Sequence, residues 1–402
     1  MNRYSRYLPY LTLTTAVIVI YFSSLYFGFT FLDDNVLIID QQHFLSNFSN
    51  IWQTFHHDVF FSVQNQAYYR PLLTISFMLD TLWGGGKEWA YHFGNIYIHL
   101  ITVWLVYATI IKMNYQRQAA LIITLLFTVH PILTQAVAWI PGRNDSLLAV
   151  FALASFYLLI DARLWSKIIS ILFFILALFT KETALFLPIV YFLYRWLVER
   201  KKILSQTNLY LLTGYMLVIL LWVPLRQSAF THPLESNIYD LIRSGLSNFP
   251  ATLLYVGKII FPFNLTVLPN IIDSSYLWGF IALSIIIIIL YLSRKILHLR
   301  GVIFGLMWFV ILLVPSFMRP NNEIMPDFLE HRVYLSMFGL LIVALEIGLK
   351  NINLTKRIHL YLASAIIVGL SFISFFHSQV FANRIVFWQN ATTGSPSSPL
   401  AH

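Results

Sequence analysis

The 402 residues include 58% hydrophobic, 17% aromatic and only 11% charged side chains, whereas an ordinary soluble domain holds about 25% charged residues. This composition excludes a chain of soluble domains, and the lack of cysteine excludes disulfide and thiolate chemistry. The net charge of +9 is spread over many loops instead of forming one patch, so we expect no nucleic-acid partner.

Long apolar runs predict an all-α, polytopic transmembrane bundle of about 10–12 helices, each run approaching the roughly 20 residues that cross a bilayer. The first run covers about residues 8–30 and follows Arg3 and Arg6. No small-residue cleavage site follows it, so a retained anchor is expected rather than a signal peptide. Further spans are expected near residues 92–111, 118–135, 146–160, 167–180, 184–198, 208–225, 277–293, 302–318, 335–349 and 358–376.

Residues 248–269 are apolar enough to cross the membrane, but a crossing there would move the basic cluster at 294–300 to the outer side. A re-entrant or interfacial hairpin is therefore preferred, and Pro250, Pro262 and Pro269 favour it because proline interrupts helices.

The 26 Lys and Arg residues predict the orientation. More than half of them fall at the N-terminus and in alternate short loops, which are therefore expected to be cytoplasmic. Of the 17 acids, only Asp161 and Glu199 fall in those loops, and Glu346 falls within a span. We expect an integral membrane protein, with its functional site on the non-cytoplasmic side and its basic face against anionic lipid headgroups.

The first outer loop, at about 31–90, is long and rich in aromatic residues, which predicts short helices lying in the membrane interface. The GGG sequence at 84–86 indicates a turn. A metal site at the HHD sequence of 56–58 is less expected than a solvated loop, because adjacent ligands rarely converge on one ion.

Two adjacent carboxylates, Asp33 and Asp34, follow the first span directly. They could be simple anchors in headgroup water. Alternatively, one carboxylate accepts a proton or holds a cation while its neighbour positions it, and adjacent acids raise one another's pKa.

Several further polar residues stand at the outer ends of spans. His130 precedes Pro131, where a helix stop with a capping imidazole is the plainer interpretation, and Arg143 opens a segment that could form a turn and cap. Lys181 lies between two apolar helices and needs a partner, for which an anionic ligand is a candidate. Its neighbour Glu182 points to a different face and does not pair with it simply.

A second group of polar residues opens a late span. Glu330 and Arg332 could form a local ion pair, and His331 and Tyr334 lie beside them. For an anionic phosphate, arginine would offer a bidentate fork and lysine a point charge.

The order of these motifs resembles the GT-C superfamily of polytopic glycosyltransferases that use polyprenyl-phosphate-linked sugars. It resembles in particular the O-mannosyltransferase-like proteins that join a membrane domain to tetratricopeptide (TPR) repeats, and their bacterial relatives. The matching stretches are LDD at 32–34, YYRPL at 68–72, HPILTQAVAWIPGRNDSLLA at 130–149, TKETALFLP at 180–188 and EHRVYLSMFGL at 330–340. Gln135 departs from the pattern where an acid is expected, and Ser336 where proline is expected.

The resemblance implies a GT-C fold over 1–376, with a short non-cytoplasmic tail at 377–402 that leads toward absent TPR repeats. It implies sugar transfer from a polyprenyl-phosphate donor to a hydroxyl of a protein (Ser or Thr) or glycan acceptor. No cofactor is certain, and a divalent cation at the acid pair stays open. The expected residues are Asp33 or Asp34 as the base, Arg332, Lys181, Arg143, His130 and His331 at the phosphate, and Arg70, Glu182, Glu330 and Tyr334 as further candidates.

Two other functions stay open. A secondary transporter should place ionisable residues near mid-membrane on broken helices in two related halves. Glu346 is the main buried acid, and no internal repeat is evident. In a non-catalytic membrane scaffold, the acids and cations would be anchors.

Overall fold

A computed structural model describes residues 4–62, 66–202, 205–233, 237–295, 297–318, 328–349 and 357–402. Within these ranges the chain is helical, with one isolated bridge between Gln66 and Pro233 in place of any named strand. The predicted all-α class is confirmed. Residues 319–327 of the last expected outer loop lie outside the described ranges.

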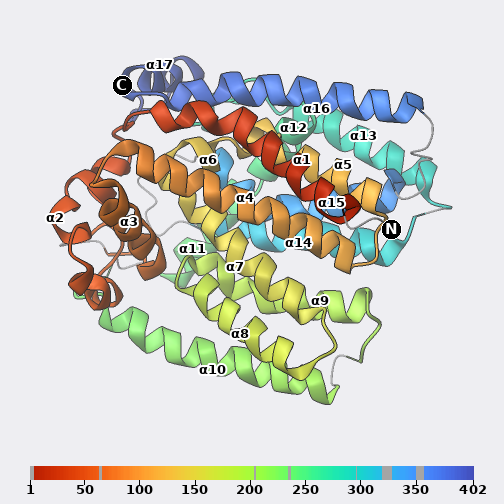
Figure 1. Cartoon of the computed structure of the whole chain (residues 1–402), viewed down its shortest axis with the longest axis horizontal. Helices are drawn as coiled ribbons and strands as arrows, with labels where there is room; N and C mark the ends of the chain where they lie inside the picture. Colours follow the sequence, from red (N-terminus) through yellow and green to blue (C-terminus); the bar gives the residue numbers. More distant parts are fainter. Residues whose placement is uncertain are drawn as a thin grey trace.

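The helices follow one another along the chain (Figure 1). The first are α1 (Tyr4–Tyr21), η1 (Phe22–Tyr26), η2 (Asn35–Ile39), α2 (Gln42–Leu45), η3 (Phe48–His56) and α3 (Pro71–Gly84). The next are α4 (Glu88–Lys112), α5 (Arg117–Thr128), η4 (Pro131–Leu133), α6 (Gln135–Ala138), η5 (Ile140–Gly142), α7 (Arg143–Leu159), α8 (Leu164–Leu178), η6 (Glu182–Phe186) and α9 (Leu187–Leu197). The last are α10 (Gln206–Ser228), α11 (Ile238–Asn248), α12 (Ala251–Ile260), α13 (Leu277–Ser293), α14 (Leu299–Leu313), η7 (Val314–Phe317), η8 (Glu330–Val333), α15 (Met337–Ala344), η9 (Leu345–Leu349), α16 (Arg357–Ser378), η10 (Gln379–Phe381) and α17 (Arg384–Gly394).

Five helical stretches in the described ranges are long and apolar enough to cross a membrane, and a sixth forms if the bent pair α5 and η4–α6 is one span. The five are Tyr7–Tyr26, Glu88–Lys112, Gln206–Ser228, Leu299–Phe317 and Arg357–Phe381. Other expected spans are helices of 10–17 residues, such as α8 and α13. The chain is therefore an integral membrane protein. Helix α12 has ten residues, a rise of about 15 Å, which agrees with the expectation that 248–269 does not cross as a helix.

Large aromatic side chains pack where α7 meets α9 and α14. The Phe156 ring lies 4.9 Å from Tyr194 and 5.0 Å from Trp308, measured between ring centroids. Helices α14 and α15 approach closely because Gly305 faces Gly339, and a Cβ on either glycine would clash with the other's backbone. In Figure 1, α10 and α16 lie on opposite edges of this packed centre.

The short helices of the first loop gather at one end of the bundle, where α1 ends and α4 begins (Figure 1, left). Pro71 stands in the first turn of α3, where its missing N–H costs no helical bond. Gly85 ends α3 with φ +65°, as the GGG sequence predicts. On η3, Trp52 is 76% exposed, a placement that suits a helix lying in the membrane interface.

The polar segment after α16 packs against the rest of the chain. Within α17, the Asn390 Oδ1 atom accepts a hydrogen bond from Val267 N (3.0 Å), and Trp388 Nε1 donates to Thr30 O (3.1 Å). Beyond α17, Ser395 Oγ donates to Leu268 O (2.6 Å). This segment therefore supports the turn that contains Thr30.

Candidate functional site

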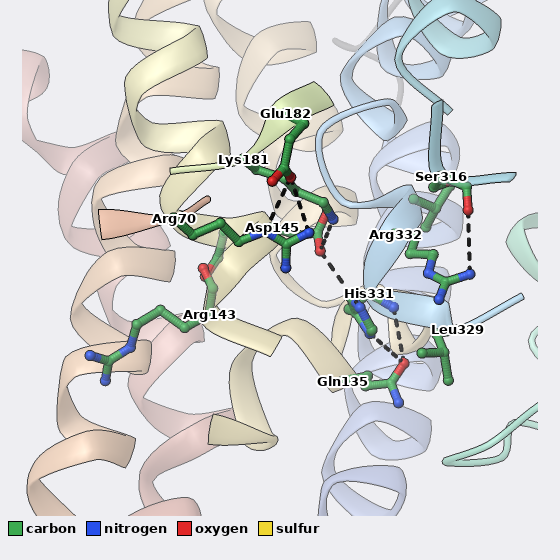
Figure 2. Close-up of polar contacts among 12 residues, drawn as sticks. Arg70, Gln135, Arg143, Asp145, Lys181, Glu182, Ser316, Leu329, His331 and Arg332 are labelled. Carbon is green, nitrogen blue, oxygen red and sulfur yellow. Dashed lines mark hydrogen bonds and ion pairs between the residues drawn. The ribbon is translucent and has the colours of Figure 1, made fainter. Parts of the chain in front are cut away.

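A cavity of about 440 Å³ lies where the first loop meets η6, α10 and η8. Its lining includes six charged side chains from five separate segments of the sequence: Asp33, Arg70, Lys181, Glu182, Arg226 and Arg332. Figure 2 shows five of the residues around this cavity, Arg70, Lys181, Glu182, His331 and Arg332, together with the side chains that hold them. Asp33 and Arg332, which are far apart in the sequence, therefore line the same cavity.

The turn before η2 gives the two adjacent acids different surroundings. Asp33 lines the cavity and has φ +63°, in the left-handed region that few residues other than glycine adopt. Asp34 is only 1% exposed, and its Oδ2 atom accepts hydrogen bonds from Thr30 N (2.6 Å) and Thr30 Oγ1 (2.9 Å). Asp34 therefore closes the turn that presents Asp33.

Two tryptophans fix the other side of this turn. Trp139 Nε1 donates to Thr30 Oγ1 (3.1 Å), while Trp388 Nε1 donates to Thr30 O. Burial raises the pKa of Asp34 above its usual value, and the hydrogen bonds from Thr30 oppose that shift.

Lys181 has a carboxylate partner within the protein. Its Nζ atom lies 2.7 Å from both carboxylate oxygens of Asp145, in the first turn of α7. Burial lowers the pKa of Lys181, and the Asp145 carboxylate opposes that shift. The positive charge of Lys181 is therefore neutralised by Asp145 before any ligand binds.

Glu182 pairs with Arg70 across the cavity wall. Its Oε2 atom accepts from Arg70 Nε (3.2 Å) and Nη2 (3.1 Å), and its Oε1 atom accepts from Tyr69 N (3.0 Å). The neighbours Lys181 and Glu182 do not pair with each other, as the sequence predicts. Their partners hold η6 against both α7 and the start of α3.

His331 is oriented by Gln135. Gln135 Nε2 donates to Val267 O (2.8 Å), so Oε1 accepts from His331 N (3.0 Å) and from His331 Nδ1 (3.1 Å). The proton therefore belongs on Nδ1, and Nε2 faces the Asp145 carboxylate at 3.6 Å. Burial and the nearby Lys181 and Arg332 hold the pKa of His331 well below its usual value, so the ring is neutral at pH 7.

Two cavity arginines contact backbone carbonyls. Arg332 Nη1 lies 3.5 Å from Ser316 O (Figure 2). Arg226 Nη2 donates to Ala67 O (3.1 Å). Arginine can engage a carbonyl and still present other N–H donors to a ligand.

The structure does not bring Arg143 into the cavity, in contrast to its expected place at the phosphate. Its side chain points away from the other labelled cations (Figure 2) and is 1% exposed. It forms an ion pair with Asp80 and donates to Asn95 Oδ1 (2.6 Å) and Tyr91 O (2.7 Å). The ion pair and hydrogen bonds of Arg143 therefore join α7 to α3 and α4.

His130 also lies outside the cavity lining. Its Nδ1 atom accepts from Ile132 N (3.3 Å), and its Nε2 atom contacts Ile259 O (2.9 Å). The capping interpretation of this imidazole is confirmed.

Glu330 and Tyr334 lie behind the cavity wall rather than on it. Glu330 is fully buried and pairs with Lys258 (2.7 Å) and His377 (3.1 Å), so the structure does not show the local pair with Arg332. The Tyr334 hydroxyl lies 2.5 Å from His99 Nδ1. Both residues position η8, which carries His331 and Arg332.

Sequence reasoning missed Asp145 and Arg226 as parts of this site. Asp145 could have been found from the sequence, because a lysine between two apolar helices, such as Lys181, needs an acidic partner. Nothing in the sequence indicated Arg226, since an arginine in the last turn of an apolar helix is an ordinary interfacial anchor. Across the described ranges, no three His, Cys, Asp or Glu side chains gather as a metal site would require.

No family model matches the chain. A solved structure of ArnT from Cupriavidus metallidurans bound to undecaprenyl phosphate aligns with 96% of this chain and 78% of its own, at 11% identity and a TM-score of 0.49.

Curated proteins give sequence matches. The chain is 32% identical to human Protein O-mannosyl-transferase TMTC3 over 139 residues and 34% identical to Drosophila melanogaster Protein O-mannosyl-transferase Tmtc1 over 121 residues. These matches cover 34% and 29% of this chain but only 15% and 14% of the relatives. Over about a third of its length, this chain is similar to the TMTC protein O-mannosyl-transferases.

Proposed function

We propose that this protein is a membrane glycosyltransferase that moves a sugar, with mannose as the first candidate, from a polyprenyl-phosphate donor to an acceptor hydroxyl. The similarity to proteins named O-mannosyl-transferases supports the reaction class. The observation that carries the proposal is the cavity itself, which is lined by Asp33 and by four cationic side chains.

The donor's anionic phosphate would be bound by the cations of the cavity. Arg332 offers a planar fork, while Lys181 and Arg70 contribute positive charge that is partly balanced by Asp145 and Glu182. His331 is neutral and already donates its one N–H to Gln135, so it lines the site without adding a positive charge. Arg143 and His130 have no part in this binding because their side chains are used elsewhere.

Asp33 is the proposed general base. The acceptor hydroxyl oxygen attacks the anomeric carbon, its proton passes to the Asp33 carboxylate, and the bond between that carbon and the phosphate oxygen breaks. The polyprenyl phosphate leaves with the bonding electron pair, and the cations stabilise its added negative charge. Asp34 acts by holding the turn, through its hydrogen bonds to Thr30.

We further propose a GT-C arrangement over 1–376, with 377–402 as a segment that would lead toward TPR repeats. The cavity would face the periplasm or exterior of a bacterial inner membrane, opposite the basic loops. A protein Ser or Thr hydroxyl is the preferred acceptor, in keeping with the names of the relatives. If a divalent cation binds here, we propose that Asp33 alone of the acid pair binds it. Asp34 does not line the cavity, and its Oδ2 atom accepts hydrogen bonds from Thr30.

Transfer of radiolabelled mannose from a polyprenyl-phosphate donor, with the purified protein in lipid vesicles, tests the proposal. Asp33→Asn should reduce turnover by roughly 10²–10⁴-fold, the usual contribution of a general base. Asp40→Asn is the matched control, because Asp40 is an exposed acid of the same loop that does not line the cavity.

Each outcome has a clear meaning. Normal turnover by Asp33→Asn would remove the proposed base. Absence of transfer from mannose, glucose and aminosugar donors alike would overturn the enzyme proposal and leave the transporter or scaffold functions.

A further inference from the structure

Two cations of the cavity are already paired with acids. Lys181 holds both oxygens of Asp145, and Arg70 holds Glu182 through two N–H groups. A ligand anion near either cation meets a site whose charge is largely balanced. Lys181 and Arg70 therefore attract an anion less strongly than a cation without an acidic partner would.

Arg226 differs from these two in its partners. It stands in the last turn of α10, where Nη2 donates to Ala67 O and the guanidinium lies 4.7 Å from the centre of the Phe230 ring. Within the described ranges, no carboxylate lies within ion-pair distance of Arg226, and Glu182, which interacts with it electrostatically, is already paired with Arg70. A carbonyl and an aromatic face leave the positive charge in place, and the Ala67 contact uses one of five N–H donors.

The backbone around Arg226 is fixed by a side chain of the first loop. Gln66 Oε1 accepts from Thr231 N (2.7 Å) and His232 N (3.1 Å), while Gln66 N donates to His232 O (3.1 Å). The first loop is thereby joined to the chain directly after α10. Ala67 follows Gln66, so the same contact places the carbonyl that holds Arg226.

We infer that Arg226 binds the phosphate group of a lipid-linked ligand in this cavity, and that Gln66 is the positioning residue that aims it. The identity of the ligand rests on the proposed function. The contact itself rests on an arginine that lines a cavity, whose direct contacts are a carbonyl and aromatic rings, and which feels the Glu182 carboxylate only through space. The sugar-linked donor carries one phosphate charge and the released polyprenyl phosphate carries nearly two, so Arg226 should favour the released product most strongly.

Binding of undecaprenyl phosphate tests the inference without any turnover. The full chain in detergent micelles is titrated with this lipid, and the quenching of tryptophan fluorescence is followed, since Trp139 lines the cavity. Arg226→Gln should raise the dissociation constant roughly tenfold to hundredfold, the range for a lost charge-assisted hydrogen bond. Arg226→Lys should fall between wild type and Arg226→Gln, because it keeps the charge but loses the fork.

Arg294→Gln is the matched control. Arg294 also lies over an aromatic ring, that of Tyr291 at 4.0 Å, but outside the cavity, so its variant should bind as wild type does. Undecaprenol, which lacks the phosphate, should bind wild type and Arg226→Gln equally. Inorganic phosphate alone should bind weakly, and tight binding of inorganic phosphate with no binding of the lipid would overturn the lipid assignment.

Gln66→Ala separates positioning from a general loss of structure. We expect weaker binding of undecaprenyl phosphate, unchanged binding of undecaprenol and a melting temperature close to that of wild type. Equal lipid-phosphate binding by Arg226→Gln and wild type would overturn the inference even if wild type transfers sugar. Lost binding in Arg226→Gln, together with a wild type that transfers no sugar from any donor, would sustain the inference and overturn the proposed function.

Discussion

Lys181 Nζ lies 2.7 Å from each carboxylate oxygen of Asp145, a residue 36 positions earlier in the chain. Both side chains are buried, so each supplies the counter-charge that the other needs away from water. The pair joins η6 to α7, and the same carboxylate faces His331.

Breaking this pair should cost stability. Asp145→Asn leaves the Lys181 ammonium buried without its counter-charge, which should lower the free energy of unfolding by about 3–5 kcal/mol. Thermal unfolding in detergent measures the effect. The double variant Asp145→Leu with Lys181→Met should recover much of the loss, and a double variant less stable than either single one would contradict the ion-pair explanation.

The pH dependence of stability should carry a contribution from Asp34. Burial raises the folded-state pKa of this acid above 3.8, so between 3.8 and the raised value the folded protein holds more protons than the unfolded chain. Stability therefore falls as pH rises through that window, and the loss is complete above the folded pKa. Melting temperatures of wild type and Asp34→Asn across this range test the sign: the wild-type curve should fall more steeply with pH, and parallel curves would contradict it.

Arg143 and Arg332 should behave oppositely when each is replaced by methionine. Arg143→Met removes the partner of Asp80 and should reduce the free energy of unfolding by up to about 3–5 kcal/mol. Affinity for undecaprenyl phosphate in the folded fraction should stay within twofold of wild type. Arg332→Met should give the reverse pattern, with weaker lipid binding and a small change in melting temperature. Loss of lipid affinity in both variants would show that Arg143, like Arg332, takes part in binding the phosphate.

Gln135→Glu should change the protonation of His331. A carboxylate in place of the amide oxygen that accepts from Nδ1 should raise the pKa of the imidazole, because an adjacent negative charge favours its cationic form. Titration of the histidine by ¹⁵N NMR measures the shift, and Gln135→Met is the uncharged control. An unchanged or lower pKa in Gln135→Glu would show that Asp145 and Lys181, rather than residue 135, set the protonation of this ring.

The local features of this protein could be predicted from the residues in order. Apolar runs predicted a helical membrane protein, the glycines at 84–86 predicted a turn, and His130 before Pro131 predicted a capped helix stop. Each follows from interactions between residues a few positions apart. Span length was predicted less well, because packed helices such as α9, with 11 residues, satisfy their apolar surface against neighbouring helices as well as against lipid.

Tertiary structure decided which charged residues meet. Nothing in the order of residues distinguishes Asp33 from Asp34, yet the turn sends one into the cavity and commits the other to Thr30. In the same way, Arg143 joins three helices while Arg226, a plain interfacial arginine in the sequence, reaches the cavity. Composition and short spacings set where helices form, whereas the partner of a buried charge depends on side-chain packing between segments far apart in the chain.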